Sequence, residues 1–410
     1  MSEKWIIGAQ VSTSHTSPDG LTLDAVLATV ERVSSAIDLD ILVVGARESP
    51  EIFRGLCGPG RGVDEVVLWY NVLSDIESME GSELVVNWRG ERSRGWGGWA
   101  EKAAEVNETF RFVCPNNPAV QAKSLGRLRE LLTRYPFTGA FLDKVRFPSP
   151  ANGLEEVASC FCDHCRRAAK AIDLDLEDVA RLFDDRTLVL GASQSERANG
   201  SEPHWLTELA VPNPLLDRFL RFRMDSITNL VAKAHALISG LGRRVAADLF
   251  SPGLAQLVGQ DYRGLARYCD WIKPMTYRVA LGPAGLRLEI PALAAGISRM
   301  FGVSEARISE WAARHVHGFD RHTLQMTRDH AVPLPVITAE IGSAVQLAHP
   351  IPVYFGLELV SHPGVVEITP QLVGEMVQAG RRANAAGLVI SWDLMHAPMD
   401  GIQALAAETL

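Results

Sequence analysis

Four acidic residues stand at the ends of short apolar runs that are spread over the chain: Asp143, Asp248, Glu358 and Asp393. Hydrolysis of a glycosidic bond needs two carboxyl groups flanking the bond, one protonated to assist the leaving oxygen and one ionised to act as base or nucleophile. Like charges that share a partly dry cleft push their pKa values apart, which produces that division. We interpret Asp143, Glu358 and Asp393 as candidate catalytic groups, and Asp248 as a group that holds a sugar hydroxyl. The alternative for each one is structural, because a strand-end carboxylate often caps a helix or pairs with an arginine.

Other side chains with binding chemistry lie near these strand ends. Arg146 follows Asp143 by three residues, and strand alternation puts Lys273 and Tyr277 on one face of their segment. Flat aromatic rings can stack on a sugar face. The predicted substrate-binding residues are Arg146, Asp248, Lys273, Tyr277, Trp392 and Trp88. Trp96 and Trp99, in the segment 95–99, could also stack on a sugar, and for them the alternative is that they attach a surface loop to the body of the protein.

A cluster of cysteines is the sharpest short motif in the chain. Cys160, Cys162 and Cys165 lie within six residues, and three thiolates so close together match the reach of a tetrahedral zinc ion. We predict Cys114, at the end of an apolar run, as the fourth ligand, with His164 as the alternative. Four protein ligands would make the zinc structural, because no position is left for water or substrate. The other interpretation is that these are ordinary reduced thiols.

These residues must be positioned by a repeating pattern of strands and helices. Apolar, β-branched runs alternate with amphipathic stretches along the chain, which is typical of a parallel sheet with crossover helices. Strands are predicted at 5–11, 39–45, 139–145, 244–250, 270–277, 352–359 and 387–394, and the third strand at either 110–114 or 66–70. Helices are predicted at 23–36, 120–135, 213–240, 261–268 and 369–386, and the region 291–347, which includes Glu340, is predicted to be mostly helical.

Eight strands in this order predict one (β/α)8 TIM barrel over residues 1–410, with a cysteine-bearing insertion at 149–212 after the fourth strand. In such a barrel the interior is packed core, and reactive groups sit at the C-terminal ends of the strands. The acidic residues at the ends of the apolar runs are therefore expected around one mouth.

Composition restricts the partners. The net charge is −9 and the pI is near 5.7, which argues against a nucleic-acid partner and favours a small neutral or weakly polar carbohydrate. No run approaches about 18 uninterrupted apolar residues, so no membrane span is expected. The N-terminus lacks a basic start and a sustained apolar run, so we expect a cytoplasmic protein without a signal peptide, with reduced thiols. No organic cofactor is expected, and the sequence is compatible with a homo-oligomer.

Two motifs resemble known families. The segment Asp143-Lys-Val-Arg-Phe-Pro148 resembles the Asp-x-x-Arg-(Tyr/Phe)-Pro strand end of uncharacterised glycoside-hydrolase-like barrels. The Cys-x-Cys-x-x-Cys spacing, with an earlier lone cysteine, is similar to the zinc cluster of a β-galactosidase family with the same fold. Those β-galactosidases end the fourth strand in Asn-Glu, whose Glu is the acid, where this chain has Leu142-Asp143. In barrel glycosidases that act on α-linked sugars, an Asp at that place is the nucleophile. The resemblance implies a glycoside-hydrolase-like enzyme and leaves the role of Asp143 open.

Two other functions compete with this interpretation. Lys273 ends the sixth predicted strand, where Schiff-base lyases or aldolases of barrel fold keep their nucleophilic amine. Such an amine needs a lowered pKa, and an acidic rim would raise it instead. A non-catalytic sugar-binding barrel is the third possibility, because a fold alone does not establish turnover.

Overall fold

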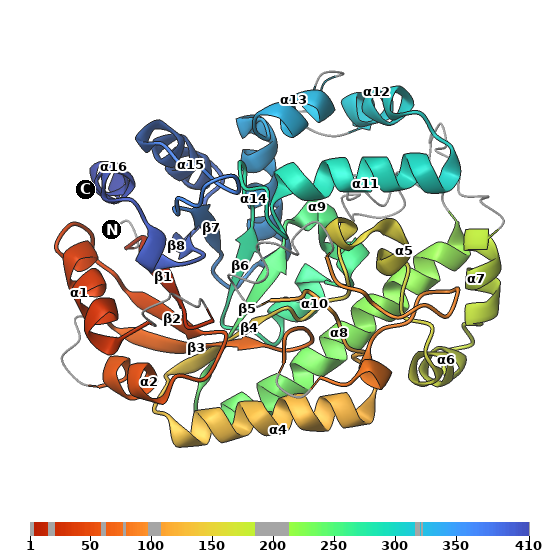
Figure 1. Ribbon diagram of the computed structural model, residues 1–410, viewed down its shortest axis with the longest axis horizontal. Coiled ribbons are helices and arrows are strands. Elements are labelled where there is room, and N and C mark those ends of the chain that lie inside the picture. The colour runs from red at the N-terminus through yellow and green to blue at the C-terminus, as the bar shows by residue number, and fades with distance from the viewer. Residues whose placement is uncertain are drawn as a thin grey trace.

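Eight parallel strands form one sheet that closes on itself (Figure 1). The computed structural model describes residues 4–14, 21–58, 63–76, 79–96, 108–184, 213–315, 320 and 323–409. In chain order the strands are β1 Ile6–Ser12, β2 Ile41–Gly45, β3 Glu65–Asn71, β4 Gly139–Asp143, β5 Arg244–Phe250, β6 Trp271–Met275, β7 Tyr354–Glu358 and β8 Gly387–Ser391. Each of the first six strands pairs with its neighbour in sequence, and β8 pairs with both β1 and β7. A bridge between Ile272 and Val353 joins β6 to β7, so the predicted (β/α)8 barrel is confirmed.

The inside of the barrel is a packed core. Alternate strand positions supply it with side chains that include Val43, Phe141, Trp271 and Val389. The rings of Phe141 and Trp271 stack with their centroids 5.3 Å apart. Parallel strands buried on both faces need apolar residues at nearly every position. Polar side chains on the inward face are therefore expected only at the ends of the strands.

Helices surround the sheet (Figure 1). They are α1 Leu23–Ser34, α2 Pro50–Leu56, α4 Pro118–Arg134, α8 Pro214–Gly240, α9 Pro252–Ala255, α10 Tyr262–Ala266, α11 Leu286–Phe301, α12 Glu305–His315, α13 Thr323–Asp329, α14 Leu334–Ala348, α15 Pro370–Arg382 and α16 Met399–Thr409, with short 3-10 turns η1 Gly81–Glu83, η5 Gln256–Val258 and η6 Leu394–His396. Asn117, Asn213 and Thr369 each cap a helix through the side-chain oxygen, and a proline follows each of them. Both features stabilise a helix start, which is why these helices begin close to their predicted positions.

The strands also form close to their predicted positions, with two differences. The third strand is β3, so the 66–70 alternative is confirmed, whereas 110–114 makes only isolated antiparallel bridges through Phe112 and Val113. The eighth strand ends at Ser391 rather than at 394. Asp393 was expected at a strand end, and this is wrong: it is the N-cap of η6, because its carboxylate accepts a hydrogen bond from the backbone N–H of Met395.

A long excursion separates β4 from α8. Its described part forms η3 Pro150–Asn152, α5 Leu154–Val157, α6 Asp163–Lys170 and α7 Leu176–Asp184. Residues 185–212 of the predicted insertion lie outside the described residues.

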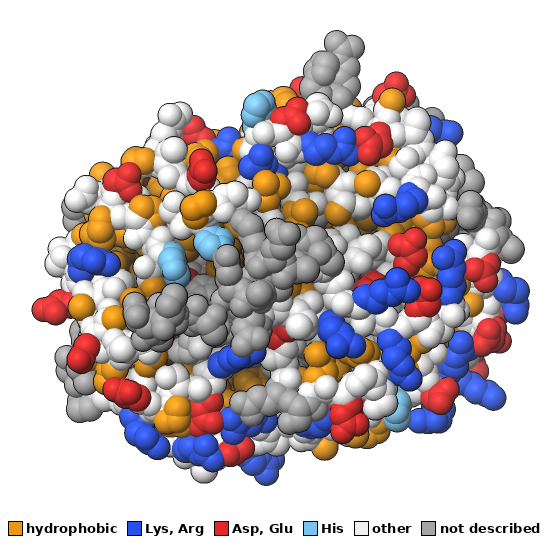
Figure 2. All heavy atoms as spheres, in the orientation of Figure 1, with side chains coloured by type: hydrophobic (Ala, Val, Ile, Leu, Met, Phe, Trp, Pro, Cys, Tyr) orange, Lys and Arg blue, Asp and Glu red, His pale blue; other side chains and the backbone are white. Residues whose placement is uncertain are grey.

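The face seen in Figure 2 carries acidic and basic side chains interspersed with one another. Among the described residues, no single helix has the length and apolar composition to cross a bilayer. Taken together, α13 and α14 reach that length and composition, and they are bent by 97° at their junction.

Candidate active site

A cavity lies at the C-terminal ends of the strands, where the barrel fold places reactive groups. Its lining includes three acidic side chains, two basic ones and four aromatic rings: Glu108, Asp143 and Asp248; Lys144 and Arg146; and Trp69, Phe110, Tyr277 and Trp392. Five of the predicted site residues therefore share one cavity: Asp143, Arg146, Asp248, Tyr277 and Trp392. Sequence reasoning missed Glu108, Trp69 and Lys144.

Asp143 is the last residue of β4, and both of its carboxyl oxygens are held. The indole Nε1 of Trp69 donates to Oδ2 at 2.9 Å, and the backbone N–H of Lys144 donates to Oδ1 at 2.5 Å. The residue is 7% exposed. Two N–H donors suit an ionised carboxylate and fix its plane at the cavity wall.

Asp248 lies beside Asp143, because Leu142 of β4 pairs with Ala247 of β5 and the two aspartates directly follow these residues. Its Oδ2 accepts a hydrogen bond from Lys273 Nζ at 2.9 Å. Its Oδ1 is buried and has no hydrogen-bond partner in the described part of the chain. Burial raises the pKa of Asp248 to about 7, with the charge of Asp143 adding to the rise and that of Lys273 opposing it.

Lys273 is fully buried behind this cavity rather than on its surface. Its ammonium donates to Gln10 Oε1 at 2.6 Å as well as to Asp248. Burial alone would lower the pKa of Lys273, but the carboxylate of Asp248 outweighs burial and raises it. Lys273, which was predicted to bind substrate, therefore pairs with Asp248, and its amine is held in the charged form.

Lys144 connects Glu108 to the rim of the barrel. Its Nζ lies 2.8 Å from Asp75 Oδ2 and 2.9 Å from Glu108 Oε1, and it stands 4.4 Å from the ring centre of Phe110. Burial raises the pKa of Glu108, and the nearby charges of Asp75 and Asp143 add to that rise. Glu108 ends no apolar run, so no strand pattern in the sequence pointed to it.

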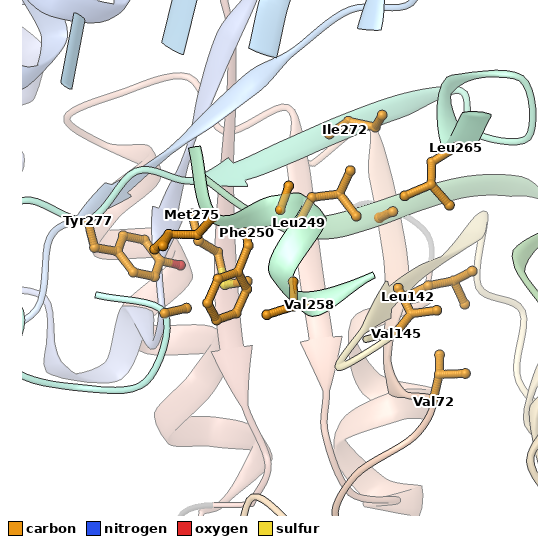
Figure 3. Close-up of a cluster of buried hydrophobic side chains, with 14 of the residues drawn as sticks. Val72, Leu142, Val145, Leu249, Phe250, Val258, Leu265, Ile272, Met275 and Tyr277 are labelled. Carbon is orange, nitrogen blue, oxygen red and sulfur yellow. The ribbon is translucent and has the colours of Figure 1, made fainter. Parts of the chain in front are cut away.

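Two aromatic residues predicted to bind substrate line the cavity, and a third does not. The rings of Tyr277 and Trp392 lie 5.8 Å apart, and Tyr277, Met275 and Phe250 form a row at the ends of β5 and β6 (Figure 3). Trp88 instead packs on Phe183 of α7 and donates its Nε1 to Asp184 at 2.8 Å. It therefore attaches α7 to the segment after β3 and is not among the residues that line the cavity.

Glu358 and Asp393 are not among the residues that line the cavity. Glu358 is fully buried and accepts hydrogen bonds from the backbone N–H groups of Arg278, Val279 and Ala280 at 2.7 to 3.1 Å. Burial raises its pKa to about 7, against the effect of these donors. Asp393 accepts from Ser12 and Met395 and contacts the ring of His396. Both carboxyl groups are held by contacts within the protein, and neither lines the cavity with Asp143.

Replacing Glu358 with alanine tests this structural assignment. Three buried N–H groups lose their acceptor, and each unsatisfied group costs about 1–3 kcal/mol, so we expect the free energy of unfolding to fall by at least about 3 kcal/mol in urea titrations. Glu375→Ala is the matched control, because that carboxylate pairs with Arg278 near the surface, where ion pairs contribute roughly 0–1 kcal/mol. A Glu358→Ala protein with unchanged stability and no activity would restore Glu358 as a catalytic candidate.

The four predicted cysteines lie together, away from this cavity. The Sγ atoms of Cys114, Cys160, Cys162 and Cys165 are all within 4.8 Å of one another, and none of these cysteines forms a disulfide. The Sγ of Cys114 is 3.4 Å from that of Cys162 and 3.5 Å from that of Cys165. Four sulfurs at the corners of a zinc tetrahedron would stand roughly 3.8 Å apart, so the group could hold a metal ion. His164, the alternative ligand, is not part of the group.

Comparison with known proteins adds to this geometry. No protein-family model and no curated protein sequence matches the chain. Among solved structures, the glycoside hydrolase domain of PgaB (BpsB) from Bordetella bronchiseptica is similar over 99% of both chains, with a TM-score of 0.59 and 13% identity. The chain shares its (β/α)8 barrel fold with this glycoside hydrolase domain. The fold implied by the Asp-x-x-Arg-Phe-Pro segment is thereby confirmed.

Two further solved structures are similar to the chain over most of its length. The catalytic domain of β-amylase from Paenibacillus polymyxa has a TM-score of 0.49 at 9% identity, covering 98% of this chain and 95% of that one. The spore cortex-lytic enzyme SleL from Bacillus megaterium has a TM-score of 0.48 at 10% identity, covering 100% of this chain and 75% of that one. At these identities the likeness concerns the fold alone.

Proposed function

We propose that the protein is a glycoside hydrolase whose two catalytic carboxyl groups are Asp143 and Asp248. The observation on which this depends is the unpartnered Oδ1 of Asp248 in a cavity wall that also holds Asp143. A buried polar atom without a partner is costly, and such an atom in a cleft points to a ligand or reacting group that completes it. Hydrolysis of a panel of aryl glycosides by the purified protein tests the function directly.

The two carboxyl groups differ in the way this reaction requires. Because the pKa of Asp248 is raised to about 7, a substantial fraction of this group is protonated near neutrality, and that proton can pass to the leaving glycosidic oxygen. Asp143 is held by two N–H donors as a carboxylate would be, so it serves as nucleophile or base. This assignment replaces Glu358 and Asp393 as partners of Asp143 and gives Asp248 a catalytic role instead of a hydroxyl-binding one.

The remaining lining suits a small glycoside or oligosaccharide. Trp69, Tyr277 and Trp392 contribute flat rings, and Ser12 and Ser14 contribute hydroxyl groups. Sugars are recognised by this combination of stacking faces and a few directed polar groups. A non-catalytic sugar-binding barrel would share the lining, and absence of turnover across the whole aryl-glycoside panel would favour it.

A Schiff-base mechanism at Lys273 is not supported by the geometry. The nucleophile of such an enzyme must be an uncharged amine. Here Asp248 raises the pKa of Lys273, and the ammonium is fully buried between Asp248 and Gln10. We therefore propose that the charge of Lys273 limits how far the pKa of Asp248 rises.

The role of Asp248 as acid predicts the pH dependence. Because the protonated form is the active one, kcat/KM should fall as the pH rises through about 7. In Lys273→Met the cation that lowers the pKa of Asp248 is gone, so this alkaline limb should move upward by about 1 unit or more. Lys123→Met, whose amine pairs with Glu83 outside the cavity, should leave the limb in place. An alkaline limb that does not move in Lys273→Met would rule out Asp248 as the acid.

We also propose that the cysteine cluster holds a structural zinc ion, which would join the segment after β3 to the start of α6. The donor set fits, because four thiolates form a closed tetrahedral site and the backbone N–H of Val86 and the amide of Asn116 donate to the sulfurs of Cys160 and Cys165 at 3.4 Å.

Arg223 supplies a second argument for this site. Its guanidinium is buried, two of its nitrogens have no hydrogen-bond partner among the described residues, and Cys160 and Cys165 lie within electrostatic range. A buried cation needs nearby negative charge. Zinc held by four thiolates carries a net charge of about −2 and would supply it.

A further inference from the structure

Arg146 is a buried cation that faces the cavity without an acidic partner. The residue is 3% exposed, and its guanidinium carbon contacts two aromatic rings, 4.4 Å from the ring centre of Phe112 and 4.5 Å from that of Phe250. Its Nη1 donates to the backbone carbonyl of Phe147 at 3.0 Å. Contact with the two rings restricts the orientation of the guanidinium, whose remaining N–H groups lie in its plane.

No described carboxylate lies within ion-pair distance of this guanidinium. Four carboxylates act on it electrostatically without pairing with it: Glu289, which acts most strongly, Asp143, Asp75 and Asp248. The carboxyl oxygens of Glu289 accept hydrogen bonds from Ser149, Ala151 and Ala284 at 2.8 to 2.9 Å. A guanidinium has five N–H donors, and burial without a carboxylate or comparable acceptor is costly. Within the described residues, the carbonyl of Phe147 accepts from this guanidinium, and its other N–H groups can bind an acceptor of a ligand in the cavity.

The other cations near the cavity are already engaged. Lys144 is held by Asp75 and Glu108, and Lys273 by Asp248 and Gln10. Arg146 is therefore the basic side chain in the described lining that remains available for an anion. A planar fork of N–H donors matches a carboxylate, which accepts two parallel hydrogen bonds, better than it matches a neutral hydroxyl.

We propose that Arg146 binds the carboxylate of a uronic acid unit, so that the substrate is an acidic saccharide. This inference rests on the proposed hydrolase function and specifies its substrate class. It differs from the neutral substrate that the net charge of −9 favoured. A net charge acts over long distances and is screened by salt, whereas a fixed guanidinium acts at contact distance in a site that excludes water.

Binding and turnover measured separately test the proposal. In Asp143→Asn protein, calorimetric titration should show glucuronic or galacturonic acid binding roughly 10- to 100-fold more tightly than glucose or galactose, as expected for hydrogen bonds to charged groups. Adding Arg146→Met should remove that preference. Arg146→Lys keeps the charge but not the planar pair of N–H donors, so it should lose most of the preference for uronates. In wild-type protein, kcat/KM for the matching 4-nitrophenyl uronide should exceed that for the hexoside by a similar factor, which decides the matter even if neither Arg146 variant folds.

The control is Arg278→Lys, an arginine outside the cavity that pairs with Glu375, and it should leave the preference unchanged. Equal binding of uronates and neutral sugars would overturn the inference, as would tighter binding of glucose 6-phosphate than of either uronate. Hydrolysis of neutral glycosides without a uronide preference would refute this inference and leave the hydrolase function intact. Selective uronate binding without hydrolysis of any aryl glycoside would refute the hydrolase function and leave the carboxylate site intact.

Discussion

Asp143→Asn and Asp248→Asn should each reduce kcat for the best aryl glycoside by about 10³-fold or more, within or above the range of 10²–10⁴ that a positioned acid or base contributes. An amide has nearly the size of the carboxylic acid, so Asp143→Asn should keep the melting temperature of the wild type within a few degrees. Asp248→Asn leaves the buried ammonium of Lys273 without its carboxylate partner, so it should melt at a lower temperature. Asp143→Asn removes the ionised group that Trp69 and the Lys144 backbone hold, and Asp248→Asn removes the proton donor. Steady-state kinetics on protein of verified fold is the measurement.

Asp393→Asn is the matched control, because Asp393 caps η6 and lies outside the cavity lining. It should keep activity within a few-fold. Near wild-type activity in both Asp143→Asn and Asp248→Asn would refute the assignment of the pair. Loss of activity in Asp393→Asn alone would make Asp393 a catalytic candidate again and would show that the chemistry does not occur in this cavity.

The purified protein should contain about one zinc ion per chain, and removal of the metal should lower the stability of the fold substantially. Structural zinc sites contribute on the order of 10 kcal/mol of apparent binding free energy, which is folding free energy when the site forms only on folding. We therefore expect Cys165→Ser to lose the metal and to lower the free energy of unfolding by at least about 5 kcal/mol. Elemental analysis and urea titration with and without a chelator measure the two effects.

Cys269→Ser is the control for this experiment, because Cys269 is a buried thiol outside the cluster. It should retain full zinc content and lose little stability. Wild-type protein with well under one equivalent of any metal, and a melting temperature that a chelator does not change, would show that the four thiols are simply reduced. Since the cluster lies apart from the cavity, any metal-free protein that stays folded should still turn over substrate.

The strand pattern was sufficient to predict that Asp143 and Asp248 lie together at one mouth of the barrel. In β4, β5 and β6 the inward phase is marked by a buried apolar residue two positions before the polar one: Phe141 before Asp143, Ala246 before Asp248 and Trp271 before Lys273. A strand has a period of two, and parallel strands in a barrel end at one mouth, so these positions converge whatever the loops do. The cysteine spacing similarly predicted a cluster, because three thiols within one helix turn and its approach cannot lie far apart.

Only the folded chain reveals what each inward side chain contacts. Glu358 shares the inward phase, yet three backbone N–H groups from the loop after β6, about 80 residues away in sequence, take up its carboxylate. Glu108, in contrast, follows no strand and reaches the cavity because Lys144 holds it there. Hydrogen-bond partners of this kind depend on how loops close over the barrel. Periodicity determines the direction of a side chain, whereas its charge state and its availability to a substrate depend on neighbours that are distant in the sequence.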